Sequence, residues 1–243
     1  METDLLRAAF KRIRLTFEDR TCPDCAAPFR CRDTEPASAA CPTCTAKRRQ
    51  AAALAAWKQK VDEWIEAHVP PTYRTARIAD CPQTELVEAV GGLWPGVDAA
   101  KCVLVYSGAG RGKTHLGWAA AVEWARTQFE LPQVWPASSL LNSLSAEKWE
   151  SLAAYERRMR VLERDCGLLV LDDLGTEVLT DTTSEHLYRI VDARWSWRRP
   201  MLVLSNLPIR EISLRYDRIA SRLAKVRIAM EGPDRRVTEG GAR

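Results

Sequence analysis

The spacing of apolar residues divides the chain into short apolar runs and longer segments with helical periodicity. Short apolar runs, typical of strands buried in a parallel sheet, occupy residues 102–106, 133–137, 167–171 and 201–205. Apolar residues at helical spacing follow them at residues 116–125, 138–164, 184–197 and 213–225. Because strands that alternate with helices form parallel sheets, the chain from about residue 72 onward predicts an α/β domain.

The N-terminal part has a different pattern, in which two predicted helices flank a cysteine-rich segment. Apolar stripes predict helices over residues 3–15 and 46–68, and the second stripe consists of Leu54, Trp57, Val61, Trp64 and Ile65. Helical periodicity explains the tryptophans, so we interpret this stripe as packing against the cysteine-rich segment rather than as a base-stacking surface. A double proline at residues 70–71 ends the second helix. The predicted domains are residues 1–68 and 69–232, followed by a flexible tail over residues 233–243.

Four of the eight cysteines have the spacing of a zinc site, because Cys22 and Cys25 form one Cys-x-x-Cys pair and Cys41 and Cys44 another. Four thiolates satisfy the tetrahedral preference of Zn²⁺, and such a site folds a segment too small for its own core. Disulfides are the alternative, which a reducing compartment disfavours. Cys31 is an alternative ligand or a spare thiol, and the symmetry of the two pairs leads us to omit it. The remaining cysteines, predicted to be small core residues, are Cys81, Cys102 and Cys166.

The run from residue 102 to residue 117, CVLVYSGAGRGKTHLG, predicts a strand, a glycine-rich phosphate loop and a helix. Glycines let backbone N–H groups surround phosphate oxygens at the positive end of a helix. Lys113 is placed to reach the β- and γ-phosphates, and the Thr114 hydroxyl is placed to hold Mg²⁺. Ser107 stands where the usual pattern has its first glycine. The predicted nucleotide-binding residues are Ser107, Gly108, Ala109, Gly110, Arg111, Gly112, Lys113, Thr114 and His115.

Polar residues follow two further predicted strands. Asp172 and Asp173 come directly after residues 167–171, and Asn206 follows residues 201–205. Because ligands of open α/β sheets bind at the carboxyl ends of the strands, Asp172 is expected in the Mg²⁺ shell and Asp173 beside the attacking water. Asn206 is expected to contact the γ-phosphate and that water. A helix cap or turn is the alternative for the two acids, and simple strand termination is the alternative for Asn206.

The helix predicted over residues 213–225 carries Arg215, Arg218 and Arg222. A guanidinium suits the charge that develops on a transferring phosphoryl group, including when a neighbouring subunit supplies it. Arginines on a helix surface are otherwise usually solvated. Only their place in the order of motifs favours a functional role for these three arginines over a solvated position on the surface.

Composition and charge are those of a globular protein with one ordinary domain and a smaller appendage, at 243 residues, 46% hydrophobic and 28% charged. No apolar run approaches the roughly 20 residues that a membrane span needs, so we expect a cytoplasmic protein without membrane contact. The net charge of +4 is too mild to require a nucleic-acid partner. Basic residues nevertheless cluster at residues 7–14, 47–49, 157–160 and 198–199.

The order of the motifs carries a family resemblance. The runs are TYRTARIAD, SGAGRGKTHLGWA, VWPASSLL, LLVLDDLGTE, TSEHLYRIVDARWSWRRPMLVLSNLP and YDRIASRL. Together, over about residues 69–230, they resemble the AAA+ ATPases of the bacterial or phage helicase-loader family, which are DnaC- and DnaI-like and close to the IstB-like transposition ATPases. The resemblance implies a three-layer AAA+ domain that binds ATP and Mg²⁺, hydrolyses ATP slowly and self-associates through the ATP site. It also implies single-stranded DNA and a DnaB-like replicative helicase as partners.

The resemblance also implies roles for individual residues. Lys113 and Thr114 match the phosphate and Mg²⁺ residues, and Asp172 matches the acid of the metal shell. Asp173 stands where many AAA+ proteins have a catalytic glutamate, with Glu177 in reserve. The remaining matches are Asn206 with the polar sensor, Arg222 with the arginine finger and Arg218 with the arginine one turn before it.

Some features depart from the family pattern. Ser107 replaces a glycine, Asp173 is a short acid, and little sequence follows residue 230, so we expect an absent or minimal helical lid and weak hydrolysis. Arg235 or Arg236 approximates a second sensor. We therefore expect an ATP-dependent helicase loader that grips the helicase through its zinc-binding N-terminal domain. The alternatives are an IstB-like ATPase that selects target DNA for a transposase, and a zinc-containing nucleic-acid binder whose ATP-driven assembly involves negligible turnover.

Overall fold

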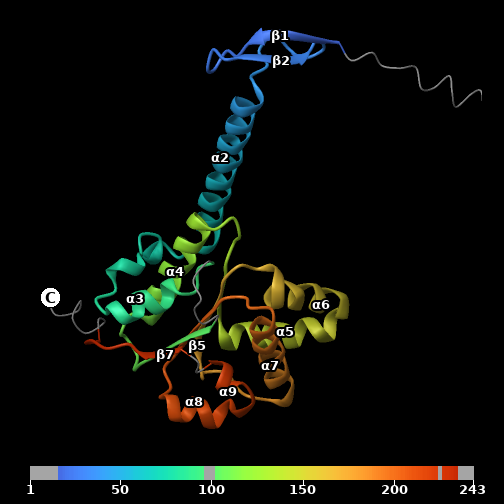
Figure 1. Cartoon of the computed structure of the whole chain (residues 1–243). Helices are drawn as coiled ribbons and strands as arrows, with labels where there is room; N and C mark the ends of the chain where they lie inside the picture. The colour runs from blue at the N-terminus through green and yellow to red at the C-terminus, as the bar shows by residue number, and fades with distance from the viewer. Residues whose placement is uncertain (1–15, 96–101, 224–225, 235–243) are drawn as a thin grey trace, which may run out of the picture. The chain divides into compact units, whose positions relative to one another are not determined.

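The computed structural model describes residues 16–95, 102–223 and 226–234 (Figure 1). The helix predicted over residues 3–15 and the second-sensor arginines at residues 235 and 236 lie outside the described residues. The chain divides into two compact units after Lys60, whereas the sequence places the boundary after residue 68. The domain limits stay predictions. None of the described helices is long and apolar enough to span a membrane.

The first unit contains an antiparallel hairpin of β1 (Phe17–Thr21) and β2 (Pro28–Arg32), followed by the start of α2 (Pro42–His68). The hairpin was not predicted, because its two strands carry mostly exposed side chains and lack an alternating apolar pattern. A small apolar cluster of Cys22, Ala40, Cys41 and Cys44, with Phe29 packed against it, forms the core of this unit. Small cores of this kind are typical of units that a metal site stabilises.

The apolar stripe of α2 does not pack against the cysteine-rich segment as interpreted from the sequence. Its buried members Val61, Trp64 and Ile65 belong to the second unit, while Leu54 is 43% exposed. The physical reason is length, because the helical residues from Pro42 to Val61 span about 30 Å at 1.5 Å per residue. The stripe is a packing surface, as expected, but the interpretation of its partner was wrong.

The second unit contains a parallel sheet with the strand order β4-β5-β6-β3-β7, of which Figure 1 labels β5 and β7. The bounds are β3 Cys102–Tyr106, β4 Gln133–Pro136, β5 Leu169–Leu174, β6 Met201–Ser205 and β7 Val226–Ala229. The α/β class and the four strands predicted from apolar runs are therefore confirmed. The edge strand β7 was not predicted, because its side chains alternate between partly buried and exposed and form no apolar run.

The helices are α3 Thr84–Gly91, α4 Lys113–Thr127, α5 Ala137–Glu150, α6 Leu152–Arg160, α7 Asp181–Ser196, α8 Ile209–Arg215 and α9 Asp217–Leu223. Short 3-10 turns occupy Pro71–Tyr73 and Ile78–Asp80, and a π-helical turn occupies Val161–Asp165. The helix predicted over residues 213–225 is broken at Tyr216, where the backbone leaves the helical region at φ −124° and ψ 45°. This break separates α8 from α9.

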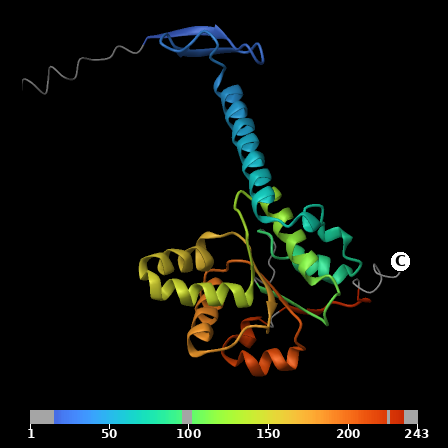
Figure 2. The ribbon, with the colours of Figure 1, turned by 180° about the vertical axis from the view of Figure 1, so that it is seen from behind.

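Alternating side chains of the strands place helices on both faces of the sheet, which gives the three layers of the predicted AAA+ fold. Val170 and Leu204 face α4, whose Gly117 lies so close that a Cβ atom there would touch both side chains. Leu171 and Val203 belong to the main apolar cluster, which α5, α6, α7 and α9 cover. Seen from both sides, α3 and α4 lie away from α5, α6 and α7 (Figure 2).

Arg194 of α7 is fully buried beside the starts of β5 and β6. Its guanidinium donates hydrogen bonds to the carbonyls of Leu162 at 2.7 Å, Gly167 at 2.8 Å and Pro200 at 2.6 Å. Burial lowers the pKa of this guanidinium from its ordinary value. The nearby Cys166 is a buried core residue, as predicted. Arg194 therefore fixes the amino ends of two strands whose carboxyl ends carry the candidate site.

Candidate functional site

The phosphate loop connects β3 to α4 and has the backbone that a phosphate cradle requires. Gly110 has φ 74° and Gly112 has φ 97°, and residues other than glycine adopt such angles at a cost. Lys113 is only 5% exposed. Its Nζ donates hydrogen bonds to the Ser107 carbonyl at 3.0 Å and to the Gly108 carbonyl at 2.8 Å. The loop thus surrounds the lysine that is predicted to bind phosphate.

Ser107 makes two contacts, of which a glycine at this position would keep one and lose the other. Its backbone N–H donates to the Ser205 carbonyl at 3.1 Å, which ties the loop to β6 and which glycine would keep. Its Oγ lies 3.1 Å from the Nζ of Lys113, and this contact requires the side chain. The departure from the usual glycine therefore adds an acceptor for the lysine that is expected to bind phosphate.

Thr114 and Asp172 come together at the foot of the loop. Asp172 is 8% exposed. Burial raises the pKa of its carboxyl group, while a hydrogen bond from the Thr114 side chain opposes that rise, and the charge of Asp173 adds to it. A hydroxyl beside a buried carboxylate supplies the oxygen ligands that Mg²⁺ prefers. The donor set therefore fits a magnesium ion at this edge of the sheet.

Asp173 occupies an unusual backbone position next to Asp172. Its φ of 52° lies in the left-handed region, and the pairing of β5 with β6 is irregular between Leu171 and Leu174. The Asp173 N–H donates to Oδ1 of Asp172 at 2.9 Å, and Nδ2 of Asn206 donates to Oδ1 of Asp173 at 2.8 Å. The structure therefore brings the second acid and the asparagine together from neighbouring strands.

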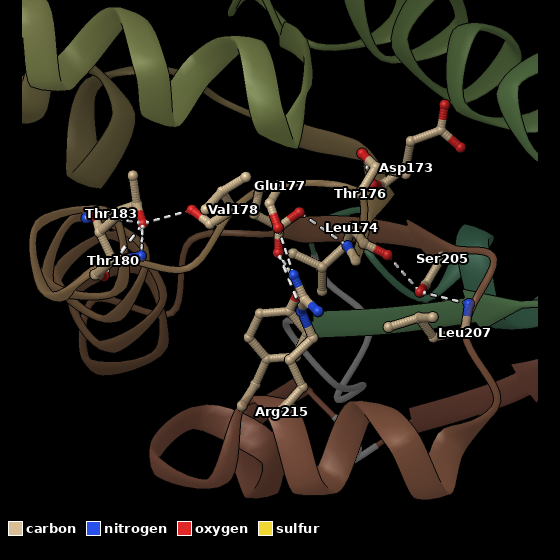
Figure 3. Close-up of polar contacts among 12 residues, drawn as sticks. Asp173, Leu174, Thr176, Glu177, Val178, Thr180, Thr183, Ser205, Leu207 and Arg215 are labelled. Atoms are coloured by element: carbon tan, nitrogen blue, oxygen red, sulfur yellow. Dashed lines mark hydrogen bonds and ion pairs between the residues drawn. The ribbon is translucent and has the colours of Figure 1, made fainter.

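Glu177, named from the sequence as the reserve carboxylate, is held in a different place. Glu177 is 3% exposed, and its carboxylate accepts hydrogen bonds from the Gly175 N–H at 2.9 Å and from the Tyr216 hydroxyl (Figure 3). Asp173, rather than Glu177, is the carboxylate that contacts Asn206. Which of the two acids positions the attacking water stays a prediction, and these contacts favour Asp173.

The two candidate arginines lie on α9 and rest on α7 of the same chain. The Arg218 guanidinium lies 4.3 Å from the centre of the Tyr188 ring, and Arg222 forms an ion pair with Asp192 at 2.6 Å. Their predicted contact with the site of a neighbouring protomer stays a prediction.

A small hollow beside the phosphate loop includes residues that sequence reasoning did not assign. The hollow is lined by Arg77, Asp80, Cys81, Gly112, His115, Leu116 and Met230. Arg77 and Asp80 belong to the run TYRTARIAD, whose place in the family order was the available signal, and Cys81 follows that run directly. The hollow adjoins Gly112 and His115, which both belong to the predicted nucleotide-binding residues.

The four predicted zinc ligands come together in the first unit. The sulfur atoms of Cys22, Cys25, Cys41 and Cys44 all lie within 4.8 Å of one another, and those of Cys25 and Cys41 are 3.7 Å apart. A tetrahedral zinc ion with Zn–S bonds of 2.3 Å requires sulfur atoms about 3.8 Å apart, so the donor set fits zinc. Cys31 lies outside this cluster, and its sulfur faces the Glu18 carbonyl at 3.9 Å.

The comparison with protein families covers most of the second unit and part of α2. The family of IstB-like ATP-binding proteins matches residues 45–221, which include the phosphate loop, both acids and Asn206. The chain belongs to this family. No match was found among curated protein sequences.

Solved AAA+ structures share the fold of this IstB-like protein. The crystal structure of DnaI has a TM-score of 0.54 and 19% identity, covering 69% of this chain and 94% of DnaI. The DnaC helicase loader has a TM-score of 0.52 and 18% identity, covering 66% of this chain and 98% of that structure. DnaA from Aquifex aeolicus, bound to AMPPCP, has a TM-score of 0.56 and 17% identity, and the chain spans only about half of it, 53%. At these identities the likeness supports the AAA+ fold alone.

Proposed function

We propose that this IstB-like protein is an ATP-dependent loader of a replicative DNA helicase. The observation that carries the proposal is the continuous set of polar groups from the phosphate loop through Thr114 and Asp172 to Asp173 and Asn206. A nucleotide-binding edge of this kind, joined to a separate cysteine-site unit, supports a protein that couples ATP to a partner. The structural similarity to DnaI and DnaC, whose solved chains are covered at 94% and 98%, also supports the proposal.

In the ATP site, Lys113 exchanges its loop carbonyls for phosphate oxygens, and the loop N–H groups complete the cradle. Thr114 and Asp172 hold Mg²⁺, which neutralises phosphate charge when bound. Asp173 orients or deprotonates the attacking water, and Asn206 fixes the orientation of Asp173. Hydrolysis is slow, because a short aspartate replaces the more usual glutamate.

Self-association through the ATP site is part of the proposal. Arg222 reaches the phosphates bound by the neighbouring copy, with Arg218 one turn earlier as the alternative. Both guanidiniums lie against α7 in the single chain, so assembly has to break the ion pair between Arg222 and Asp192. ATP then serves mainly as an assembly switch.

The partners are single-stranded DNA for the AAA+ domain and a DnaB-like helicase for the zinc-binding N-terminal domain. Described basic residues at 47–49, 157–160 and 198–199 supply phosphate contacts, while the cluster at residues 7–14 lies outside the described part of the chain. Neutralising DNA phosphates releases counterions, so DNA affinity should fall steeply with salt. DNA binding that does not depend on salt would remove these clusters from the proposal.

Co-purification tests the loader proposal directly. The full chain is mixed with the replicative helicase of its host in ATP and in ADP, and the complexes are weighed to obtain their stoichiometry. We expect a complex that depends on ATP, and we expect Lys113→Ala to lose ATP binding and that dependence. Absence of a complex at micromolar concentrations contradicts helicase loading.

A second candidate function follows from the family itself, since IstB-like proteins also include ATPases that act in transposition. Such a protein should prefer duplex DNA to single strands and stimulate a transposase rather than bind a helicase. The separate unit with four clustered cysteines favours the loader, because it is an appended domain of the kind that recruits a partner protein. Preference for duplex DNA in a competition assay would favour the transposition function.

A further inference from the structure

Glu177 lies in the loop after β5, the strand that carries Asp173, and contacts the residues at the bend between α8 and α9 (Figure 3). Its buried carboxylate accepts hydrogen bonds from the Gly175 N–H at 2.9 Å and from the Tyr216 hydroxyl. Nε of Arg215 lies 4.0 Å from this carboxylate, and Nη2 of Arg215 donates to the Glu177 carbonyl. Glu177 therefore contacts Arg215, the last residue of α8, and Tyr216, which follows it.

The far end of this contact leads directly to the arginines. Tyr216 is 4% exposed and stands at the break between the two helices, and α9 begins at the next residue. Burial and the hydrogen bond to Glu177 raise the pKa of Tyr216, so its hydroxyl stays a donor. Arg218 and Arg222 lie within the first two turns of α9, so the position of Tyr216 determines where α9 starts and where these two arginines lie.

The near end of the contact is fixed to the candidate site. Ser205 of β6 donates from Oγ to the Leu174 carbonyl at 2.6 Å, and the Leu207 N–H donates to the same Oγ at 3.1 Å. Asn206, between them in sequence, contacts Asp173. Gly175, the first residue after β5, has φ 112°, and a Cβ atom there would collide with the Leu207 side chain. The loop after β5 is thus held tightly against the end of β6.

We propose that Glu177 is a positioning residue that ties the Asp173–Asn206 pair to the helix carrying Arg218 and Arg222. A buried carboxylate that loses one partner keeps the full cost of its desolvation, so its contacts move together rather than break one at a time. A shift of the loop after β5 is therefore passed through Tyr216 to α9. The nucleotide site of one copy is linked in this way to the arginines that the same copy places at the site of its neighbour. This inference rests on the proposed function, in which those arginines act on a neighbouring site.

Mixing variants tests this link. Glu177→Gln keeps the shape of the side chain and removes its charge, and Tyr216→Phe removes only the hydroxyl. We expect each variant to bind ATP within about twofold of the wild type and to hydrolyse it about tenfold more slowly, since a hydrogen bond to a charged group is lost. Lys113→Ala keeps well-placed arginines but lacks a working site. Mixing it with Glu177→Gln should restore hydrolysis, because the intact sites then meet intact arginines.

Recovery in the mixture separates positioning from the other roles of Glu177. A catalytic carboxylate acting in its own site, or a carboxylate needed only for folding, would leave the mixture as inactive as its parts, and that result overturns the proposal. Tyr216→Phe, mixed in the same way, gives the same decision if Glu177→Gln does not fold. Arg222→Ala mixed with Lys113→Ala is the matched control. Hydrolysis that recovers in the mixture with Glu177→Gln and not in the mixture with Arg222→Ala would support the positioning role of Glu177. That result would also show that a residue other than Arg222 acts on the neighbouring site.

Discussion

Nδ2 of Asn206 donates a hydrogen bond to Oδ1 of Asp173 at 2.8 Å, which joins the carboxyl ends of β6 and β5. The same aspartate has a left-handed backbone at φ 52°, and its N–H is bonded to Asp172. Two contacts therefore fix a residue whose backbone conformation is uncommon. Backbone strain of this kind persists only where the surroundings determine it, and it is found preferentially at functional sites.

Asn206→Ala should slow ATP hydrolysis about tenfold, because Asp173 loses the hydrogen bond that orients it. ATP affinity should change less than about twofold, since the phosphate loop is untouched. Asp173→Asn should slow hydrolysis about a hundredfold if Asp173 acts as the base. Single-turnover hydrolysis and nucleotide titration measure the two quantities. An Asp173→Asn protein that hydrolyses ATP as well as the wild type, with and without single-stranded DNA, would favour a protein that only assembles on ATP.

Ser107→Ala should tighten ATP binding by about two- to fivefold, the effect of removing one hydrogen bond that competes for the lysine. In the structure, the Ser107 hydroxyl lies 3.1 Å from Nζ of Lys113, which must be released to reach a phosphate. Ser107→Gly should act in the same direction, because the backbone contacts of residue 107 remain. Titration with a fluorescent ATP analogue is the measurement. Weaker binding in both variants would show that the hydroxyl helps to hold the nucleotide.

Asp172 should make the nucleotide-free protein less stable as the pH rises. Burial raises the pKa of its carboxyl group above the ordinary value of 3.8, so the folded protein binds the proton more tightly than the unfolded chain. This stabilisation is complete below the ordinary pKa and is lost as the pH rises through the raised one. Asp172→Asn should therefore raise the melting temperature at neutral pH without nucleotide. The same variant should lose the additional stabilisation by Mg²⁺ and ATP, and a lower melting temperature at neutral pH would contradict this account.

The four clustered cysteines should bind about one zinc ion per chain, as the fit of their sulfur atoms to tetrahedral geometry predicts. Cys22→Ser and Cys44→Ser should lose the metal and unfold the hairpin, whose apolar cluster consists of few residues. Cys31→Ser should keep the metal. Elemental analysis of protein purified without a chelator and circular dichroism measure both effects. Metal-free wild-type protein would refute the zinc site.

Arg194→Ala should lower the free energy of unfolding by about 3 kcal/mol or more, because it leaves buried carbonyls without their donor and opens a cavity. The guanidinium donates to the carbonyls of Leu162, Gly167 and Pro200. Arg199→Ala is the control, since Arg199 forms a partly exposed ion pair with Glu130 and donates one hydrogen bond to the Cys166 carbonyl, so its loss should cost about 2 kcal/mol or less. Urea unfolding of both variants tests the difference. Equal losses would show that Arg194 is not a special support of β5 and β6.

Local patterns were sufficient wherever one feature of the chain dominates the structure. The apolar runs at residues 102–106 and 201–205 became β3 and β6, because strands buried on both faces need continuous apolar sequence. The glycines and Lys113 predicted the phosphate loop, since left-handed backbone needs glycine. Paired cysteines predicted their own cluster, because two residues between thiols fix a turn that presents both to a metal.

Other features depended on contacts between distant parts of the chain. The polar strands of the first hairpin and the edge strand β7 carry no strong apolar pattern, so only pairing with a partner strand reveals them. Tyr216, at the break between α8 and α9, donates a hydrogen bond to a carboxylate that lies 39 positions away in the sequence. The sequence alone determined the α/β class, the loop and the residues at the ends of β5 and β6. Only the tertiary structure decided that Glu177 turns toward Tyr216 while Asp173 meets Asn206, because the choice between two nearby carboxylates depends on which donors the folded chain brings to each.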